Sequence, residues 1–418
     1  MTMKHRASWR PLVVGLVGIM LMAGGFLVSG SLPGTDSALA AKKVRTLPFR
    51  VPAFRNELEA NLTSTGKRMW LSVLGVDRKL KLRTGVYEWR HGSWKALPGR
   101  PRTNHVTPWL ATYRPGGTGR TRLCVGDEVP GKELTRARCF VNGRWKGVGM
   151  PRYLRTMVLS GFWSGKSSFT ALFHEAGEST AKIQLARFHR GRLVPFGKPL
   201  ELPGQYVSTI GEKTSNLRGG EVDVALEVIG ASEATADTLG DRFVATFSDG
   251  EWTLSPSLPK LQMGPQPSGM VRTPTGMYFS ATEAFVQGPL SFDWPFSVFR
   301  MSDGEQSWKR VGRVLDVGPG SAQGGVFASG KDVWTVWSEQ VWKPPYGYGP
   351  ISVYAARINQ PAAGIGRPLK LWSGKALLAG ITQAISYRNG TAFLFMRQFR
   401  RGGRAQYAAV ALKKPGST

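Results

Sequence analysis

The sequence predicts an all-β fold, a β-propeller of four-stranded blades. After its first 41 residues the chain consists of short alternating runs rich in Val, Phe, Tyr, Trp and Thr, with almost no 3.6-residue periodicity. Turns containing Gly, Asn or Asp separate these runs. The same succession of strand and turn recurs at steps of about 48 to 59 residues, which suits one four-stranded sheet per repeat.

Residues 1–41 have the features of an export signal. A positively charged start precedes the apolar run from Leu12 to Gly30, and Ala38 and Ala40 form the A-x-A pattern of a cleavage site. The alternative is an uncleaved anchor, because the run just reaches membrane-spanning length, and we expect membrane contact only in that case. We therefore expect a secreted or cell-wall-associated protein, with residues 42–418 forming a single β-propeller domain.

The chain is strongly basic, with 56 Lys and Arg against 27 Asp and Glu and a formal net charge of +29. Such a charge favours polyanionic partners. The expected partner is an anionic polymer or glycan, with the cell wall and a surface protein as the candidates, and no specific nucleic-acid binding is expected. We expect a monomer. Forty-one per cent of the residues are hydrophobic, which is enough for a packed core.

Two recurring hairpins define the repeat. In one hairpin an alternating strand leads into a tight turn, after which Trp or Leu opens another strand; the turn glycines are Gly92, Gly143, Gly191, Gly250 and Gly304. Upstream of it, "VLSGFWSGKSSFTALFHE" and three similar segments supply a strand, a turn and a strongly apolar strand. We name the four strands A, B, C and D in chain order.

Counting from about Glu57 gives seven repeats, with six or eight as alternatives because repeats two and four are degenerate. The divisions fall near Pro101, Pro151, Pro203, Met263, Gly318 and Lys375. The last repeat ends before a D strand. The extended segment "KVRTLPFRVP" could supply that strand from the other end of the chain, and ring closure of this kind would cover the exposed strand edges.

The two cysteines, Cys124 and Cys139, lie in extended segments joined by a loop with Gly and Pro. This arrangement predicts a cross-strand disulfide and an oxidising compartment. No metal site is expected, because two Cys without a suitably spaced His make a poor ligand set.

In a propeller, the A–B and C–D turns share one face, and the B–C and D–A connections share the other. We assign four segments to the B–C loops: "RPGGTGRT", "HEAGEST", "EQVWKPPYGYGP" and "RQFRRGGR". We expect the ligand on the face that carries them, because binding residues concentrate on loops of a rigid scaffold. Aromatic rings held by Pro suit a sugar ring or a protein partner, and Arg clusters suit carboxylate or phosphate groups. The predicted ligand-binding residues are Arg397, Arg400, Arg401, Arg404, Trp342, Tyr346, Tyr348 and Trp294. The alternative is that the aromatic residues cover blade edges and the arginines form a solvated basic surface.

A search for catalytic groups assigns none. "HEAGE" places His174, Glu175 and Glu178 on one loop, which is either an acid–base group or an exposed polar loop. Glycosidases need two facing carboxylates. The candidates are Glu175, Asp237, Glu283, Asp293 and Glu339, and linear sequence selects no pair among them. No nucleotide-, flavin- or calcium-binding motif is present, so no cofactor is expected.

The segment "MSDGEQSWKRVG" resembles the Ser-x-Asp-x-Gly-x-x-Trp turn of sialidase-like and BNR-type propellers. Asp303 and Trp308 have the spacing of that motif, whereas Ser302 and Gly304 are each one residue out of register. The resemblance implies a propeller and, in the sialidases themselves, an Arg triad, a Tyr–Glu pair and an acidic Asp, none of which is assigned to a residue here. We expect Asp303 to hydrogen-bond within its own turn, on the face opposite the long loops.

Two functions follow from these observations. The first is a non-catalytic secreted propeller that binds an acidic polymer or a cell-surface partner through its B–C loops. The second is a glycan-cleaving enzyme on the same fold, a glycoside hydrolase or polysaccharide lyase acting on an anionic sugar. We favour binding, because the search for catalytic groups was empty and the fold itself supports both functions.

Overall fold

A computed structural model describes the chain in segments. The described residues are 44–47, 54, 56–65, 67–99, 109–128, 134–176, 180–203, 206–209, 216–218, 221–229, 241–256, 269–282, 285–286, 292–293, 296–315, 324–329, 332–343, 347–359, 364–374, 378–387, 390–398 and 405–413. The predicted signal segment, residues 1–41, lies outside them. No helix among the described residues is long and apolar enough to cross a membrane.

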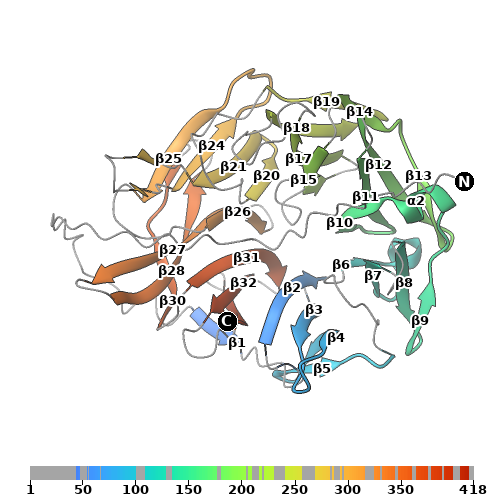
Figure 1. The fold of residues 1–418 in the computed structure, drawn as a ribbon, viewed down its shortest axis with the longest axis horizontal. Coiled ribbons are helices and arrows are strands. Elements are labelled where there is room, and N and C mark those ends of the chain that lie inside the picture. Colours follow the sequence, from blue (N-terminus) through green and yellow to red (C-terminus); the bar gives the residue numbers. More distant parts are fainter. Residues whose placement is uncertain are drawn as a thin grey trace, which may run out of the picture.

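Four- and five-stranded antiparallel sheets surround a centre in chain order (Figure 1). Six of them are each built from one continuous segment, and we call these blades 1 to 6. Blade 1 contains β2 (Asn56–Ser64), β3 (Met69–Val76), β4 (Leu82–Arg90) and β5 (Ser93–Ala96). Blade 2 contains β6 (Trp109–Tyr113), β7 (Arg122–Glu128), β8 (Thr135–Val141) and β9 (Arg144–Gly147). Blade 3 contains β10 (Val158–Ser164), β11 (Phe169–Ala176), β12 (Thr180–His189), β13 (Arg192–Pro195) and β14 (Leu200–Pro203).

The remaining continuous blades repeat this order. Blade 4 contains β15 (Tyr206–Thr209), β16 (Asn216–Arg218), β17 (Glu221–Ile229), β18 (Asp241–Ser248) and β19 (Glu251–Leu254). Blade 5 contains β20 (Gly269–Thr273), β21 (Gly276–Thr282), β24 (Phe296–Met301) and β25 (Lys309–Leu315), with a small hairpin of β22 (Phe285–Val286) and β23 (Phe292–Asp293) between β21 and β24. Blade 6 contains β26 (Gly324–Ser329), β27 (Asp332–Lys343), β28 (Gly347–Asn359), β29 (Gly364–Ile365) and β30 (Leu369–Gly374). The described helical turns are the 3-10 turn η1 (Pro115–Gly117) and the helix α2 (Arg152–Thr156).

A composite sheet joins the two ends of the chain. It consists of β31 (Leu378–Tyr387), β32 (Gly390–Gln398), β33 (Ala405–Lys413) and β1 (Val44–Leu47). The N-terminal strand β1 pairs antiparallel with β33 and supplies the D strand that the last repeat lacks. The predicted propeller of four-stranded blades is thus confirmed, as is closure by the N-terminal strand. The blades number six when each must be one continuous segment, and the predicted seven is reached only by adding the composite sheet.

The core lies between neighbouring blades. Of the seven apolar clusters among the described residues, six join two consecutive sheets and one lies within blade 6. For example, Trp70 of blade 1 packs with Leu123 of blade 2. The central strands are buried on both faces, as in β3, where seven of the eight residues are buried. This burial explains why the B strands are continuously apolar in sequence rather than alternating.

The predicted C–D turns are confirmed. Four of them are two-residue connections in which both residues have positive φ, as at Asn142 (51°) and Gly143 (78°). This is the geometry of a type I′ turn, whose twist matches that of the flanking strands. The fifth turn, at Gly304, is longer and joins Met301 to Lys309.

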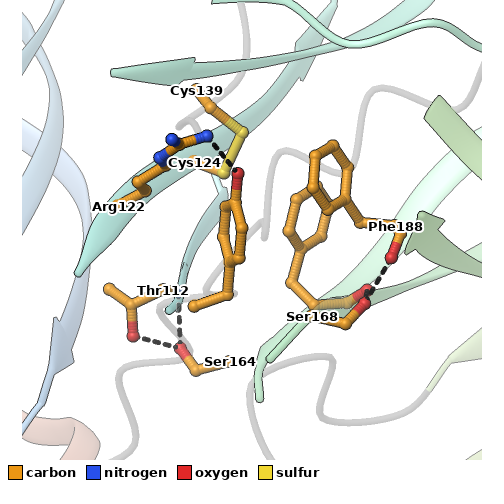
Figure 2. Close-up of a disulfide and its surroundings, with 9 residues drawn as sticks. Thr112, Arg122, Cys124, Cys139, Ser164, Ser168 and Phe188 are labelled. Carbon is orange, nitrogen blue, oxygen red and sulfur yellow. Dashed lines mark hydrogen bonds between the residues drawn. A yellow bond between two sulfur atoms is a disulfide. The ribbon is translucent and has the colours of Figure 1, made fainter. Parts of the chain in front are cut away.

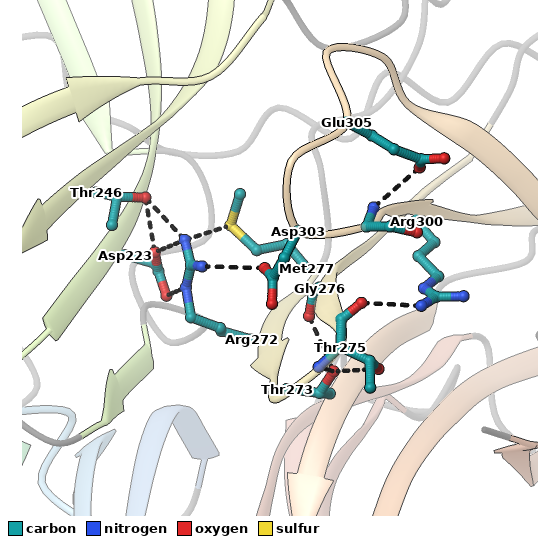
Figure 3. Close-up of polar contacts among 11 residues, drawn as sticks. Asp223, Thr246, Arg272, Thr273, Thr275, Gly276, Met277, Arg300, Asp303 and Glu305 are labelled. Carbon is teal, nitrogen blue, oxygen red and sulfur yellow. Dashed lines mark hydrogen bonds and ion pairs between the residues drawn. The ribbon is translucent and has the colours of Figure 1, made fainter. Parts of the chain in front are cut away.

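The hydrogen bonds of this fifth turn differ from the expectation for Asp303. Glu305 accepts a hydrogen bond from the Ser302 amide at 3.1 Å and donates its own amide to the Ser302 carbonyl at 3.0 Å. Asp303 instead lies 3.8 Å from the guanidinium of Arg272 (Figure 3).

The predicted cross-strand disulfide is present. Cys124 of β7 and Cys139 of β8 are directly opposite in the sheet, with Cα atoms 4.0 Å apart, and both are buried (Figure 2). The bond lies in the apolar cluster between blades 2 and 3, which also contains Tyr113 and Phe169. A disulfide in this position is consistent with an oxidising compartment.

One predicted loop lies on the opposite face of the propeller. The segment "RPGGTGRT" (114–121) joins β6 to β7, so it is an A–B connection and not a B–C loop. Its Gly residues form a 3-10 turn at the hairpin tip, with Gly116 and Gly117 at positive φ.

Candidate functional site

The predicted ligand residues fall at the loop ends of strands where the structure describes them. Arg397 is the penultimate residue of β32, and Trp342 of β27 is opposite Tyr348 of β28 in the hairpin register. All three are next to B–C connections, on the face that we call the loop face. Tyr346, Trp294, Arg400, Arg401 and Arg404 lie outside the described residues. Binding by these eight residues therefore remains a prediction.

Buried carboxylates hold the blades together in ion pairs. Asp223 of blade 4 accepts hydrogen bonds from the guanidinium of Arg272 of blade 5, both at 2.7 Å (Figure 3). Thr246 donates to Asp223 at 2.8 Å. The side chain of Asp223 is 1% exposed, so this pair connects two blades at a buried position.

Two further buried carboxylates are paired within one sheet. Asp127 accepts hydrogen bonds from Arg136 at 2.6 Å and Arg138 at 2.7 Å. Glu88 accepts hydrogen bonds from Arg68 and Arg90, both at 2.6 Å. Guanidinium groups offset the cost of burying these charges, so we assign all three acidic groups to blade structure.

The carboxylates considered for glycan cleavage do not come together among the described residues. Glu175 is exposed at the end of β11, and Glu339 of β27 accepts a hydrogen bond from the indole of Trp337 at 2.8 Å. Asp293 lies in the small β22–β23 hairpin, whereas Asp237 and Glu283 lie outside the described residues. No group of three or more His, Cys, Asp or Glu in the described part of the chain is placed to hold a metal ion.

His174 lies in a strand and not in the loop that the sequence suggested. It belongs to β11, and its Nδ1 forms a short hydrogen bond with the hydroxyl of Ser160 on the neighbouring strand β10. Burial disfavours the charged imidazolium and lowers the pKa of His174 to about 4. The ring is therefore neutral at ordinary pH. Glu178 lies outside the described residues.

A basic hollow lies on the loop face beside α2. The helix joins β9, the D strand of blade 2, to β10, the A strand of blade 3, so it belongs to a D–A connection (Figure 1). The hollow has a volume of about 440 Å³. Its lining residues are Leu134, Met150, Arg152, Arg155 and Thr156.

Local packing holds this helix in place. Leu154 is fully buried in the cluster between blades 2 and 3, which fixes one side of the helix to the core. The Thr135 hydroxyl donates to the carbonyl of Met157 at 2.8 Å, which ties the start of β8 to the residue after α2. Arg152 and Arg155 are exposed one helical turn apart, and neither forms an ion pair within the described residues.

The same helix carries an exposed aromatic side chain. Tyr153 is 50% exposed, and its carbonyl accepts a hydrogen bond from the hydroxyl of Thr156, which lines the hollow. Partial burial raises the pKa of Tyr153, so its phenol stays protonated at neutral pH. The sequence predicts Pro151 only as a division between repeats. The local signal for the arginines is "PRYLRT", in which Pro precedes two Arg at i, i+3 spacing.

Solved structures with the same architecture include polysaccharide lyases. A PL25 ulvan lyase matches with a TM-score of 0.51 and 10% identity, over 88% of this chain and 96% of that chain. The polysaccharide lyase Uly1 also matches with a TM-score of 0.51 and 10% identity, over 87% and 90%. A neuraminidase-like protein from A/bat/Guatemala matches with a TM-score of 0.43 and 9% identity, over 90% and 95%.

This likeness extends to the fold alone. At such low identity it does not transfer substrates or catalytic residues to this chain. No protein-family model matches the sequence, and no curated protein matches it.

Proposed function

We propose that this chain is a secreted or cell-wall-associated propeller that binds an acidic polymer through its loop face, without catalysis. The observation that carries the proposal is that Arg152 and Arg155 are exposed at a hollow on that face and form no ion pair among the described residues, in a chain of net charge +29. Guanidinium groups in such positions are free to bind carboxylate, sulfate or phosphate groups in bidentate fashion.

The pairing of the buried carboxylates supports binding over catalysis. Asp127, Asp223 and Glu88 already serve as acceptors for arginines within the sheets. Most glycoside hydrolases use two carboxylates that face each other across the bond to be cleaved. Glycan cleavage is the second candidate function, and its support is the propeller fold that this chain shares with polysaccharide lyases.

The test measures binding of residues 42–418 to immobilised polygalacturonate, with neutral dextran as the control polymer. We expect binding to polygalacturonate that weakens steeply with added salt, because salt screens exposed charges, and no binding to dextran. A variant with Arg397, Arg400, Arg401 and Arg404 all replaced by Ser should bind about tenfold more weakly, a change of roughly 1.4 kcal/mol.

The same experiment can contradict the proposal in two ways. Equal retention on dextran and polygalacturonate would remove charge as the basis of recognition. Release of new reducing ends or unsaturated sugars from polygalacturonate by the wild-type protein would show the glycan-cleaving alternative instead. A matched control for the loss of charge replaces Arg144, Lys146, Lys95 and Arg192 on outer strands with Ser, which removes four charges away from the loop face.

A further inference from the structure

The face opposite the loop face carries a second and larger group of positive charges. The A–B and C–D turns of blades 1 to 3 end on this face, which we call the turn face. Every residue of these six turns except Gly66 is described. The turns and the strand ends next to them carry ten Lys and Arg and no Asp or Glu. These residues are Lys67, Arg68, Arg90, Arg114, Arg120, Arg122, Arg144, Lys166, Arg190 and Arg192.

The acidic residues of the same blades gather at the other end of the strands. Of the eight acidic residues described in blades 1 to 3, seven lie toward the loop face: Glu57, Glu59, Asp77, Asp127, Glu128, Glu175 and Glu201. The eighth, Glu88, is buried and already accepts hydrogen bonds from Arg68 and Arg90. Positive charge is thus separated from negative charge along the strands, and is not merely the even excess of a basic chain.

This separation of charge is confined to one side of the ring. The C–D turn of blade 4 contains Asp249 and is followed by Glu251, and the C–D turn of blade 5 contains Asp303 and Glu305. Glu305 forms an ion pair with Lys309 at the start of the next strand. An anionic surface is therefore attracted to the turns of blades 1 to 3 more strongly than to those of blades 4 and 5.

Hydrogen bonds join the three inner turns into one platform. The Ser164 hydroxyl of blade 3 accepts hydrogen bonds from the amide and the hydroxyl of Thr112 of blade 2, at 2.8 and 3.1 Å (Figure 2). Thr63 of blade 1 has its hydroxyl oxygen 3.3 Å from that of Ser164. The backbones of blades 2 and 3 also meet, because the Arg114 amide donates to the Lys166 carbonyl at 3.0 Å. The backbone positions that carry these cations are therefore fixed relative to one another.

Several cations on the inner turns have no partner charge among the described residues. Arg68 and Arg90 share the buried Glu88, so part of their charge is already compensated. Four others are exposed and form no ion pair in the described part of the chain: Lys67, Arg114, Arg120 and Lys166. Their charge is available to phosphate groups outside the protein.

We propose that the turn face of blades 1 to 3 docks on a bilayer that contains anionic phospholipids. Its basic turns are spread over two dimensions, because the A–B turns follow the inner strands β2, β6 and β10 and the C–D turns precede the outer strands β5, β9 and β13 (Figure 1). A bilayer presents phosphate groups to inner and outer turns at the same time, whereas a linear polyanion meets them along one line. Each Lys or Arg that reaches an anionic bilayer strengthens binding about fivefold. The spread of the cations therefore favours a bilayer over a linear polyanion.

Docking in this way goes beyond the polymer binding proposed above. It directs the loop face, with the hollow of Arg152 and Arg155, away from the bilayer, so that both faces can bind at once. The sequence predicts membrane contact only through an uncleaved anchor. The turn face needs no apolar segment, because clustered exposed cations are sufficient for reversible binding to anionic lipids.

The experiment measures cosedimentation of residues 42–418, which contain every described strand, with sucrose-loaded vesicles. Vesicles of equal parts phosphatidylglycerol and phosphatidylcholine are compared with vesicles of phosphatidylcholine alone. We expect binding to the anionic vesicles only, with a steep loss of binding on addition of salt, because salt screens exposed charges. The variant Lys67→Ser, Arg114→Ser, Lys166→Ser removes one cation from each inner turn and should weaken binding to anionic vesicles about a hundredfold.

A matched control, Arg78→Ser, Lys79→Ser, Lys81→Ser, removes the same charge from the exposed B–C loop of blade 1. It should weaken vesicle binding by less than about fivefold, because this loop lies on the opposite face. Both variants should keep the thermal midpoint of the wild type, since the replaced side chains are exposed. Equal binding to the two kinds of vesicle, or equal weakening by the two variants, would overturn docking by the turn face.

Immobilised polygalacturonate separates this proposal from the proposed function. The turn-face variant should bind polygalacturonate within about twofold of the wild type, because salt screens charges on the opposite face. If it loses polygalacturonate and vesicle binding to the same extent, the turn face is a site for linear polyanions and docking on a bilayer is wrong. Absence of vesicle binding by the wild type would also refute docking, and would leave polymer binding by the loop face intact.

Discussion

Acidification should destabilise this protein through His174, well above the pH at which most carboxylates titrate. The pKa of His174 is lowered by burial from 6.5 to about 4 in the folded state. In the unfolded chain the same group titrates near 6.5. Between these two values the unfolded chain binds a proton that the folded chain does not, so acid favours unfolding.

The size of the effect follows from the shift in pKa. Above pH 6.5 the ring is neutral in both states, and the free energy of unfolding does not depend on this group. As the pH falls from about 6.5 to about 4, the free energy of unfolding decreases by on the order of 3 kcal/mol, and below pH 4 it decreases no further through this group. The cause is desolvation of the ring, since no charged group contributes to the shift.

The measurement is urea unfolding followed by tryptophan fluorescence at several pH values between 7.5 and 4. His174→Asn is the test variant, because its amide does not titrate and can still hydrogen-bond to Ser160. The wild type should lose about 3 kcal/mol more than this variant across the interval. Subtracting the free energy of unfolding of His174→Asn from that of the wild type cancels the contribution of the carboxylates, because they titrate in both proteins.

Ser160→Ala tests whether burial of the His174 ring, and not its hydrogen bond to Ser160, causes the pH dependence. It removes the hydrogen bond but leaves the ring buried, so the pH dependence of the wild type should persist in it. Parallel curves for the wild type and His174→Asn from pH 7.5 to 4 would refute the reasoning, because they would mean that His174 takes up its proton equally in both states.

Two further predictions concern how the ring is held together. Arg272→Met should lower the free energy of unfolding by about 3–5 kcal/mol, because it leaves the buried Asp223 carboxylate unpaired. Adding Asp223→Asn should recover part of that loss. A loss below about 1 kcal/mol in chemical unfolding would contradict a stabilising ion pair between the two blades. Removal of residues 42–53 takes away β1 and exposes the edge of β33, so we expect a lower thermal midpoint and concentration-dependent association in light scattering. A synthetic peptide of residues 42–53 added in trans should reverse both effects, and an unchanged, monomeric truncated protein would contradict closure by this strand.

The architecture could be predicted from sequence because its signals are local. Gly143 and the other turn glycines have positive φ, which few other residue types tolerate. The residue types at these positions therefore predict the C–D hairpins. Strand alternation and the spacing of these turns then fix the repeat. The opposed positions of Cys124 and Cys139, and the spare N-terminal strand, follow from the same repeat.

The site could be predicted only in part, for the opposite reason. Whether a loop faces the ligand depends on which strands it joins, and "RPGGTGRT" was placed on the wrong face because one strand was assigned to the wrong position in its blade. His174 was expected in a loop because the polar letters around it resemble one, although the hairpin of β11 and β12 continues past it.

The all-β repeat, the hairpin turns and the disulfide can be predicted from the chain alone, since each depends on residues within one or two strands, and the basic charge follows from composition. The pairing of Asp223 with Arg272, 49 residues away in the next blade, depends on the fold. So does the hollow that Arg152 and Arg155 line together with Leu134. Contacts of this kind arise when neighbouring blades pack around a closed ring, and no local pattern in the chain encodes which side chains meet there.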